Sequence, residues 1–371
     1  MTSPSVADAA VGLGARIGRY FSIVSMVPSL FLVVWSTALV ASDAWQSEPN
    51  LSRMVPRLAD IGFASITWLL LATIIVALFL HPLQLAMTRF LEGYWGSSPM
   101  AVKLLSMRIT HYRKQRRSLH TQERELSNIL KRRLKIFLAE QYFLDLLDEE
   151  PNIVHPENLS KEDRKEAELG MFGSDRAHEL SGLKAALESI RQEKSRYPEI
   201  DRMMPTRLGN ALRQAEDSVG RQYGLSAIRT APYLALISPE LDRSYLNDTR
   251  QQLDTSVRLC VVALLATIET VACLFTDGFW LLLALGPYLL AYLAYRGAIA
   301  AADTYMAVVR TVLDLNRFKL YESLHVRLPT STLQERKANG ALMDLLGGSD
   351  EVNVRYKHPS TGTPPTPPGS P

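Results

Sequence analysis

Two apolar runs separated by a three-residue polar turn constrain the fold of this chain more than any other feature. The runs are LCVVALLATIETVACLF and FWLLLALGPYLLAYLAY, at residues 259–275 and 279–295, and the turn is Thr276-Asp277-Gly278. Each run has 17 residues, close to the lower limit of about 17–25 residues for a helix that crosses a bilayer. The runs are too apolar and too close together to be surface helices of a soluble domain. The pattern predicts a transmembrane helical hairpin over residues 257–297.

Two further apolar runs predict another transmembrane hairpin over residues 21–87. Its first span covers residues 21–40, and its second span begins at Ile61. A secretory signal peptide is the alternative for the first run, because Ser42-Asp43-Ala44 resembles a cleavage site. The run of 20 residues is longer than the usual apolar region of a signal peptide. An uncleaved transmembrane helix is therefore favoured.

The distribution of Lys and Arg predicts the orientation of these four spans. The loop 41–60 holds two of them and the turn of the other hairpin holds none, whereas seven follow the second span between residues 89 and 117. Because positively charged loops stay on the cytoplasmic side, both termini are expected inside the cell. The prediction is an all-α integral membrane protein of a plasma membrane, with four transmembrane helices in two hairpins and a helical, coiled-coil-like cytoplasmic domain inserted between them.

The segments outside the apolar runs divide the rest of the chain. They predict a cytoplasmic N-terminus over residues 1–20 and a cytoplasmic helical domain over residues 88–256. After the last span they predict a cytoplasmic helical extension over residues 298–346 and a Pro-rich tail over residues 347–371. The tail ends in PPTPPGSP. Because such a composition cannot bury an apolar core, we expect the tail to be disordered.

The central domain begins with a long helical pattern of uneven charge. Residues 102–147 contain no Gly or Pro, and their apolar residues recur mostly three, four or seven apart, which predicts one long helix. Residues 103–135 hold 11 Lys/Arg and two Asp/Glu, whereas residues 140–179 hold 12 Asp/Glu and four Lys/Arg. After a break at residues 151–156, a second helix is expected to fold back antiparallel, with the basic part against the acidic part. The expected apolar seam joins Leu126, Leu130, Leu134 and Phe137 to Leu180, Leu183, Leu187 and Ile190.

The basic part of this helix has three alternative interpretations. It is a solvated or acid-paired helix face, a surface for anionic lipid headgroups, or a nucleic-acid contact. Juxtamembrane cations gain roughly 1 kcal/mol each at an anionic membrane surface. Nucleic acid is the least favoured partner because Tyr112 is the only aromatic residue of the run before Phe137. The candidate basic surface consists of Lys131, Arg132, Arg133 and Lys135.

One acidic residue near the middle of the third run is the most specific single feature. Glu269 is expected to face other helices and to have a partner, because a charged group deep in a span costs a few kcal/mol. Thr270 lies on the same side of the helix, and counting along the hairpin places Tyr288 within about one turn of Glu269. Glu269 is interpreted either as a structural group that holds the bundle together by hydrogen bonds or as an ion or proton site.

Motifs for soluble enzyme chemistry are absent from the sequence. The glycines match no phosphate-binding loop, no G-x-S-x-G elbow occurs, and the seven histidines form no pair at metal-ligand spacing. The two cysteines, Cys260 and Cys273, lie 13 residues apart on one predicted helix and cannot form a disulfide. We therefore expect no catalytic, cofactor or metal site.

Three segments resemble uncharacterised multi-pass membrane proteins of actinobacteria and similar bacteria. They are RFLEGYWG, PTRLGNALRQAEDSVGRQYG and VVRTVLDLNRFKLYESL, at residues 89–96, 205–224 and 308–324. The resemblance covers most of the chain after the first span and implies a bacterial inner-membrane protein, but it transfers no activity.

The expected function is that of a non-enzymatic, membrane-anchored interaction, signalling or scaffold protein that presents a charged helical domain. We expect a homo-oligomer or a complex with a membrane or cytoplasmic protein. One alternative is a small oligomeric transporter or channel that uses Glu269, and another is a membrane-disrupting effector regulated by its cytoplasmic arm.

Overall fold

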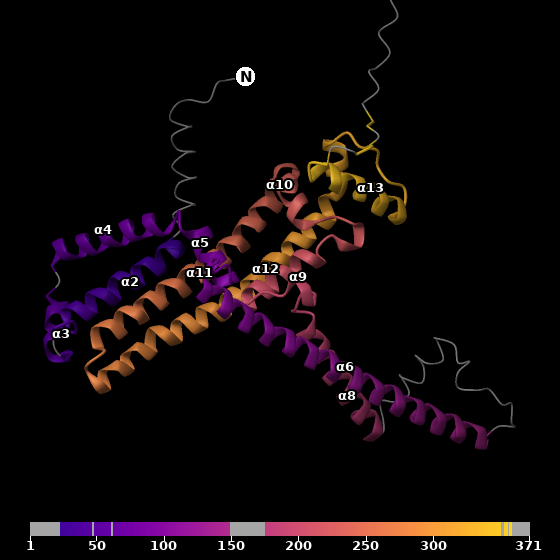
Figure 1. The fold of residues 1–371 in the computed structure, drawn as a ribbon, viewed down its shortest axis with the longest axis horizontal. Coiled ribbons are helices and arrows are strands. Elements are labelled where there is room, and N and C mark those ends of the chain that lie inside the picture. The colour runs from indigo at the N-terminus through magenta and orange to yellow at the C-terminus, as the bar shows by residue number, and fades with distance from the viewer. Residues whose placement is uncertain are drawn as a thin grey trace, which may run out of the picture. The chain divides into compact units, whose positions relative to one another are not determined.

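The computed structural model describes residues 23–46, 48–60, 62–148, 175–349, 352–354 and 356–357. Every regular element in these ranges is a helix (Figure 1), so the predicted all-α class is confirmed for them. The predicted N-terminus 1–20 and the break at residues 151–156 lie outside the described residues. The chain forms two compact units, Met1–Trp95 with Arg207–Pro371, and Gly96–Thr206.

Three helices of the first unit are long and apolar enough to cross a membrane. They are α4 (Phe63–Leu80), α11 (Glu240–Leu274) and the combination of the 3₁₀ helix η4 (Gly278–Ala284) with α12 (Leu285–Ser323). A further apolar helix, α2 (Ile23–Ala41), coincides with the first predicted span. The chain therefore has the helices of a membrane protein.

The third and fourth apolar runs continue directly into their neighbouring polar segments. α11 joins the end of the predicted helical domain 88–256 to the apolar run that begins at Leu259, since no Gly or Pro separates them. α12 similarly joins the fourth apolar run to the helix expected after it. Pro287 lies in the first turn of α12, where its missing N–H breaks no helical hydrogen bond.

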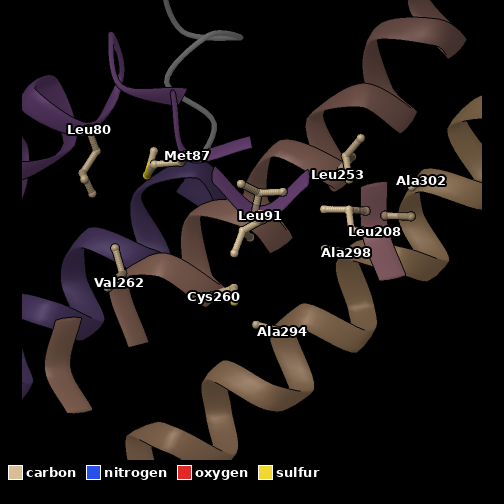
Figure 2. Close-up of a cluster of buried hydrophobic side chains, with 12 residues drawn as sticks. Leu80, Met87, Leu91, Leu208, Leu253, Cys260, Val262, Ala294, Ala298 and Ala302 are labelled. Atoms are coloured by element: carbon tan, nitrogen blue, oxygen red, sulfur yellow. The ribbon is translucent and has the colours of Figure 1, made fainter. Parts of the chain in front are cut away.

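The apolar helices lie in a row in which α4 packs on α2, α2 on α11, and α11 on α12 (Figure 1). The α11–α12 contact is the most extensive and is antiparallel, because the Asn316 amide donates to Asp242 while Gly297 lies opposite Ser256. Small side chains fill this interface, which allows the two backbones to approach closely. Figure 2 shows part of the resulting core, formed by Leu80, Met87, Leu91, Leu208, Leu253, Cys260, Val262, Ala294, Ala298 and Ala302.

Shorter helices complete the first unit. They are α3 (Leu51–Ala59), α5 (Gln84–Glu92), α9 (Arg207–Ser218), η3 (Arg221–Tyr223), α10 (Ala227–Ile237) and α13 (Thr332–Leu346). Buried polar groups fasten α13 to α12, since the Tyr321 hydroxyl donates to Asn339 at 2.5 Å and the Arg317 guanidinium contacts Glu335 at 2.9 Å. Near the start of the predicted tail, Tyr356 forms an isolated antiparallel bridge with Val326.

The second unit is an antiparallel pair of helices, α6 (Pro99–Asp148) and α8 (Asp175–Lys194), followed by the 3₁₀ helix η2 (Ile200–Arg202). The antiparallel direction follows from Glu123, which contacts Lys194, and from Arg133, which pairs with Glu179. The predicted helical hairpin is thus confirmed in the described residues. Its core extends further toward the start of α6 than the predicted seam and buries Tyr112, Leu119, Leu180, Leu187, Tyr197 and Met203. The side chain of Phe137 lies outside the described residues.

We predict that Leu187→Ala opens the α6/α8 pair. Leu187 is 4% exposed, and truncating a buried leucine costs about 2–5 kcal/mol because a cavity remains. Hydrogen exchange of the full-length protein, followed by mass spectrometry of peptides from both helices, measures the loss of protection. Leu104→Ala is the matched control, because Leu104 is 49% exposed and little burial is lost. Equal protection in the two variants would contradict the predicted core.

Candidate functional site

Two adjacent hydrogen bonds join α2 to α11 within the apolar region. The Ser36 hydroxyl donates to Oε2 of Glu269 at 2.8 Å, and Nε1 of Trp35 donates to Oγ1 of Thr270 at 2.9 Å. Thr270 also donates to the carbonyl of Ala266 at 2.6 Å, so its hydroxyl both accepts and donates a hydrogen bond. Glu269 is partly buried and Thr270 is fully buried. The structure therefore places Glu269 and Thr270 together at a helix interface, in contact with α2.

Tyr288 has a different environment from these residues. It lies on α12 with 55% of its surface exposed, and the interhelical hydrogen bonds of Glu269 and Thr270 go to α2 instead. Sequence counting considered the third and fourth apolar runs only and therefore missed Trp35 and Ser36. The adjacent hydroxyls of Ser36 and Thr37 within an apolar run were the available signal.

Glu269 has a hydroxyl partner on a neighbouring helix. A hydroxyl group donates to the carboxylate, and hydrogen bonds of this kind hold helices together in a bilayer. Across the residues that the structure describes, no group of three or more His, Cys, Asp or Glu residues is arranged to hold a metal ion. The Ser36–Glu269 pair is thus a polar contact between α2 and α11.

The second candidate site is a stripe of cations along the outer face of α6. Seven exposed Lys/Arg residues fall within an arc of about 100° around the helix, at 3.6 residues per turn: Lys103, Lys114, Arg117, Arg124, Lys131, Arg132 and Lys135. We call these seven residues the basic stripe. It extends over about 48 Å at 1.5 Å per residue. Within the described ranges, its first six members form no ion pair, whereas Lys135 has an interaction of its own.

Three of the other cations of α6 make contacts inside the second unit. Arg113 donates to the carbonyl of Ile200 at 2.9 Å, and Arg108 donates to the hydroxyl of Tyr112 at 3.1 Å. Arg133 forms an ion pair with Glu179 on α8. Three of the four residues predicted as the basic surface, Lys131, Arg132 and Lys135, thus belong to the stripe, and Arg133 instead joins the two helices.

The charge pairing between α6 and α8 differs in part from the predicted pairing of basic residues on the first helix with acidic residues on the second. Glu123 of the basic helix contacts Lys194 at 2.6 Å and Arg191 at 3.3 Å, both on α8. The hydrogen bond from Lys194, together with Arg191, holds the pKa of Glu123 below its usual value. Most of the predicted acidic segment 140–179 lies outside the residues whose side chains the structure describes. The described ion pairs between α6 and α8 therefore use Glu123 and Arg133 of α6 rather than the first six cations of the basic stripe.

A double-mutant cycle tests the link between α2 and α11. We expect Ser36→Ala and Glu269→Leu each to lower the thermal stability of the detergent-solubilised protein. The double variant should lose less than the two single losses combined, because both remove the same hydrogen bond, with a coupling energy of about 1 kcal/mol. Glu269→Gln keeps an acceptor for the Ser36 hydroxyl and should be tolerated.

The matched control for this cycle is Thr37→Ala. The Thr37 hydroxyl donates to the carbonyl of Val33 on its own helix at 2.7 Å, so its loss should be additive with that of Glu269→Leu. If Glu269→Leu is as stable as Glu269→Gln, or if Ser36 and Thr37 behave alike, the Ser36–Glu269 bond does not join the helices.

Comparison of the chain with protein-family models, curated proteins and solved structures gives no match. The functional argument for this protein therefore rests on its own residues.

Proposed function

We propose that this chain is a non-enzymatic, membrane-anchored interaction protein whose α6/α8 arm binds anionic lipid headgroups. The basic stripe on α6 is the observation that supports the proposal. Its seven cations lie on the face turned away from the apolar contact with α8. The cations lie within an arc of about 100° around α6, so one face of the helix presents them to an anionic surface.

The membrane anchor in this proposal consists of four spans in two hairpins, with both termini and the arm on the cytoplasmic side of a bacterial inner membrane. Lys and Arg follow the second span in large number, whereas the 41–60 loop holds only Arg53 and Arg57. Both of these arginines contact Asp43, at 3.6 and 2.8 Å. The positive-inside rule then places this loop outside.

Electrostatic attraction between the stripe and anionic headgroups is sufficient to bind the arm to the membrane surface. Each cation close to an anionic membrane surface contributes roughly 1 kcal/mol, so several cations acting together suffice without a lipid-specific pocket. The arm is also tied to the anchor by a short connection, since only residues 93–98 separate α5 from α6. This tether raises the concentration of headgroups near the arm. The interaction is expected to weaken with added salt, because screening acts over about 8 Å at physiological ionic strength.

The topology predicts which positions an impermeant thiol reagent can reach. In a Cys260→Ala, Cys273→Ala background, Glu48→Cys should be labelled in intact bacterial cells, because it lies in the outer loop. Ser195→Cys should be labelled only after the cells are opened. Labelling of Ser195→Cys in intact cells would place the arm outside and contradict the proposal.

The headgroup contact predicts that the arm becomes shielded on anionic bilayers. Thr121 is exposed and lies within the stripe, so Thr121→Cys in the same cysteine-free background can hold a fluorophore there. We expect iodide to quench this fluorophore less in nanodiscs that contain phosphatidylglycerol than in nanodiscs of phosphatidylcholine alone. High salt and the variant Lys114→Glu/Arg117→Glu should both remove the difference.

Lys184→Glu/Arg196→Glu is the matched control for charge. It makes the same change in net charge at exposed positions of the second unit that are outside the stripe, so shielding should persist. Equal quenching in the two lipid compositions, or equal effects of the two charge reversals, would refute binding through the stripe.

A further inference from the structure

A polar hollow of about 610 Å³ lies beside the α6/α8 contact. Its α6 wall consists of His120, Arg124, Ser127, Asn128 and Lys131, which lie on successive turns of one side of the helix. Lys194 of α8 and Glu123 complete the lining. The α6 wall is about 16 Å long, from 11 residues at 1.5 Å each.

Cations outnumber acidic groups around this hollow. Glu123 is the only carboxylate among the lining residues, and it is already paired with Lys194 at 2.6 Å and with Arg191 at 3.3 Å. Arg124 and Lys131 form no ion pair in the part of the chain that the structure describes. The hollow thus combines net positive charge with the neutral donors of Ser127 and Asn128.

We infer that this hollow is a binding site for a ligand that has two or more linked phosphate groups. The wall is longer than a single phosphate group, and its cations come from both helices. Arg124 offers the planar guanidinium that binds a phosphate through two parallel hydrogen bonds. Lys131 and Lys194 offer ammonium groups with three donors each, and Glu123 holds Lys194 at the edge of the hollow.

The site is separable from the contact with the membrane surface. Arg124 and Lys131 also belong to the basic stripe, but Ser127, Asn128 and Lys194 do not. A soluble polyphosphate and a lipid headgroup with two phosphates have the same chemistry here. Variants at Ser127, Asn128 and Lys194 therefore test the hollow without removing a cation of the stripe.

The first test is titration of inorganic triphosphate into the full-length protein in phosphatidylcholine nanodiscs, measured by calorimetry. We expect saturable binding with a stoichiometry of one. Asn128→Trp fills the hollow without changing its charge and should weaken binding by about tenfold or more, as should Lys131→Gln/Lys194→Gln. Gln122→Trp is the control for bulk, and Lys184→Gln/Arg196→Gln is the control for charge, because all three positions are exposed and outside the hollow.

The outcomes separate this inference from the proposed function. Asn128→Trp should leave the shielding of the Thr121→Cys fluorophore unchanged, because the stripe keeps its cations. If diphosphatidylglycerol nanodiscs suppress triphosphate binding more than phosphatidylglycerol nanodiscs of equal charge, the ligand source is a lipid headgroup. If they do not, a soluble polyphosphate is the ligand. No triphosphate binding, or equal binding by Asn128→Trp and Gln122→Trp, would overturn the site.

Discussion

The close antiparallel packing of α11 and α12 is the contact on which the first unit depends. Ala263 and Ala266 on α11, with Ala298 and Ala302 on α12, are almost completely buried. α11 begins at Glu240, well before its apolar run, and α12 continues to Ser323, well beyond its own run. The same contact therefore continues into the polar part of the unit. There it supports a second core that includes Val309, Leu313 and Leu320 of α12, against which α10 and α13 pack. One helix pair thus connects the apolar region to the folded part beside it.

The sequence predicted the helices well because apolar periodicity reports directly on helix formation, but it predicted the neighbours of Glu269 less well. Counting residues across the turn assumed an α-helix from Phe279 onward. Residues Gly278–Ala284 are instead a 3₁₀ helix, which turns about 120° per residue where an α-helix turns about 100°. Over seven residues the difference is roughly 140°, so counting with α-helical geometry gives the wrong direction for the residues that follow, including Tyr288. Trp35 and Ser36 were missed because hydrogen bonds between distant segments leave no local pattern.

In the second unit, apolar spacing predicted the antiparallel pair, and net charge predicted its electrostatics only in part. The 3.6-residue period identified Leu180 and Leu187 as core positions, and both are buried. Net charge does not say which side of a helix a cation occupies, although the spacing of Lys114, Arg117 and Arg124 contains that information. The contact of Glu123 with two cations of α8 also depends on the register of the pair, which the sequence does not specify.

The fold and the proposed binding surface of the second unit depend on different forces. Exposed ion pairs contribute at most about 1 kcal/mol each, whereas each buried side chain such as Leu119 or Leu187 contributes about 1.5–3 kcal/mol. Apolar burial therefore holds α6 against α8, and the stripe cations on the opposite face contribute little to that contact. The described ion pairs between the two helices use Glu123 and Arg133 of α6, so the exposed cations Lys114, Arg117 and Arg124 can change without loss of the apolar contact.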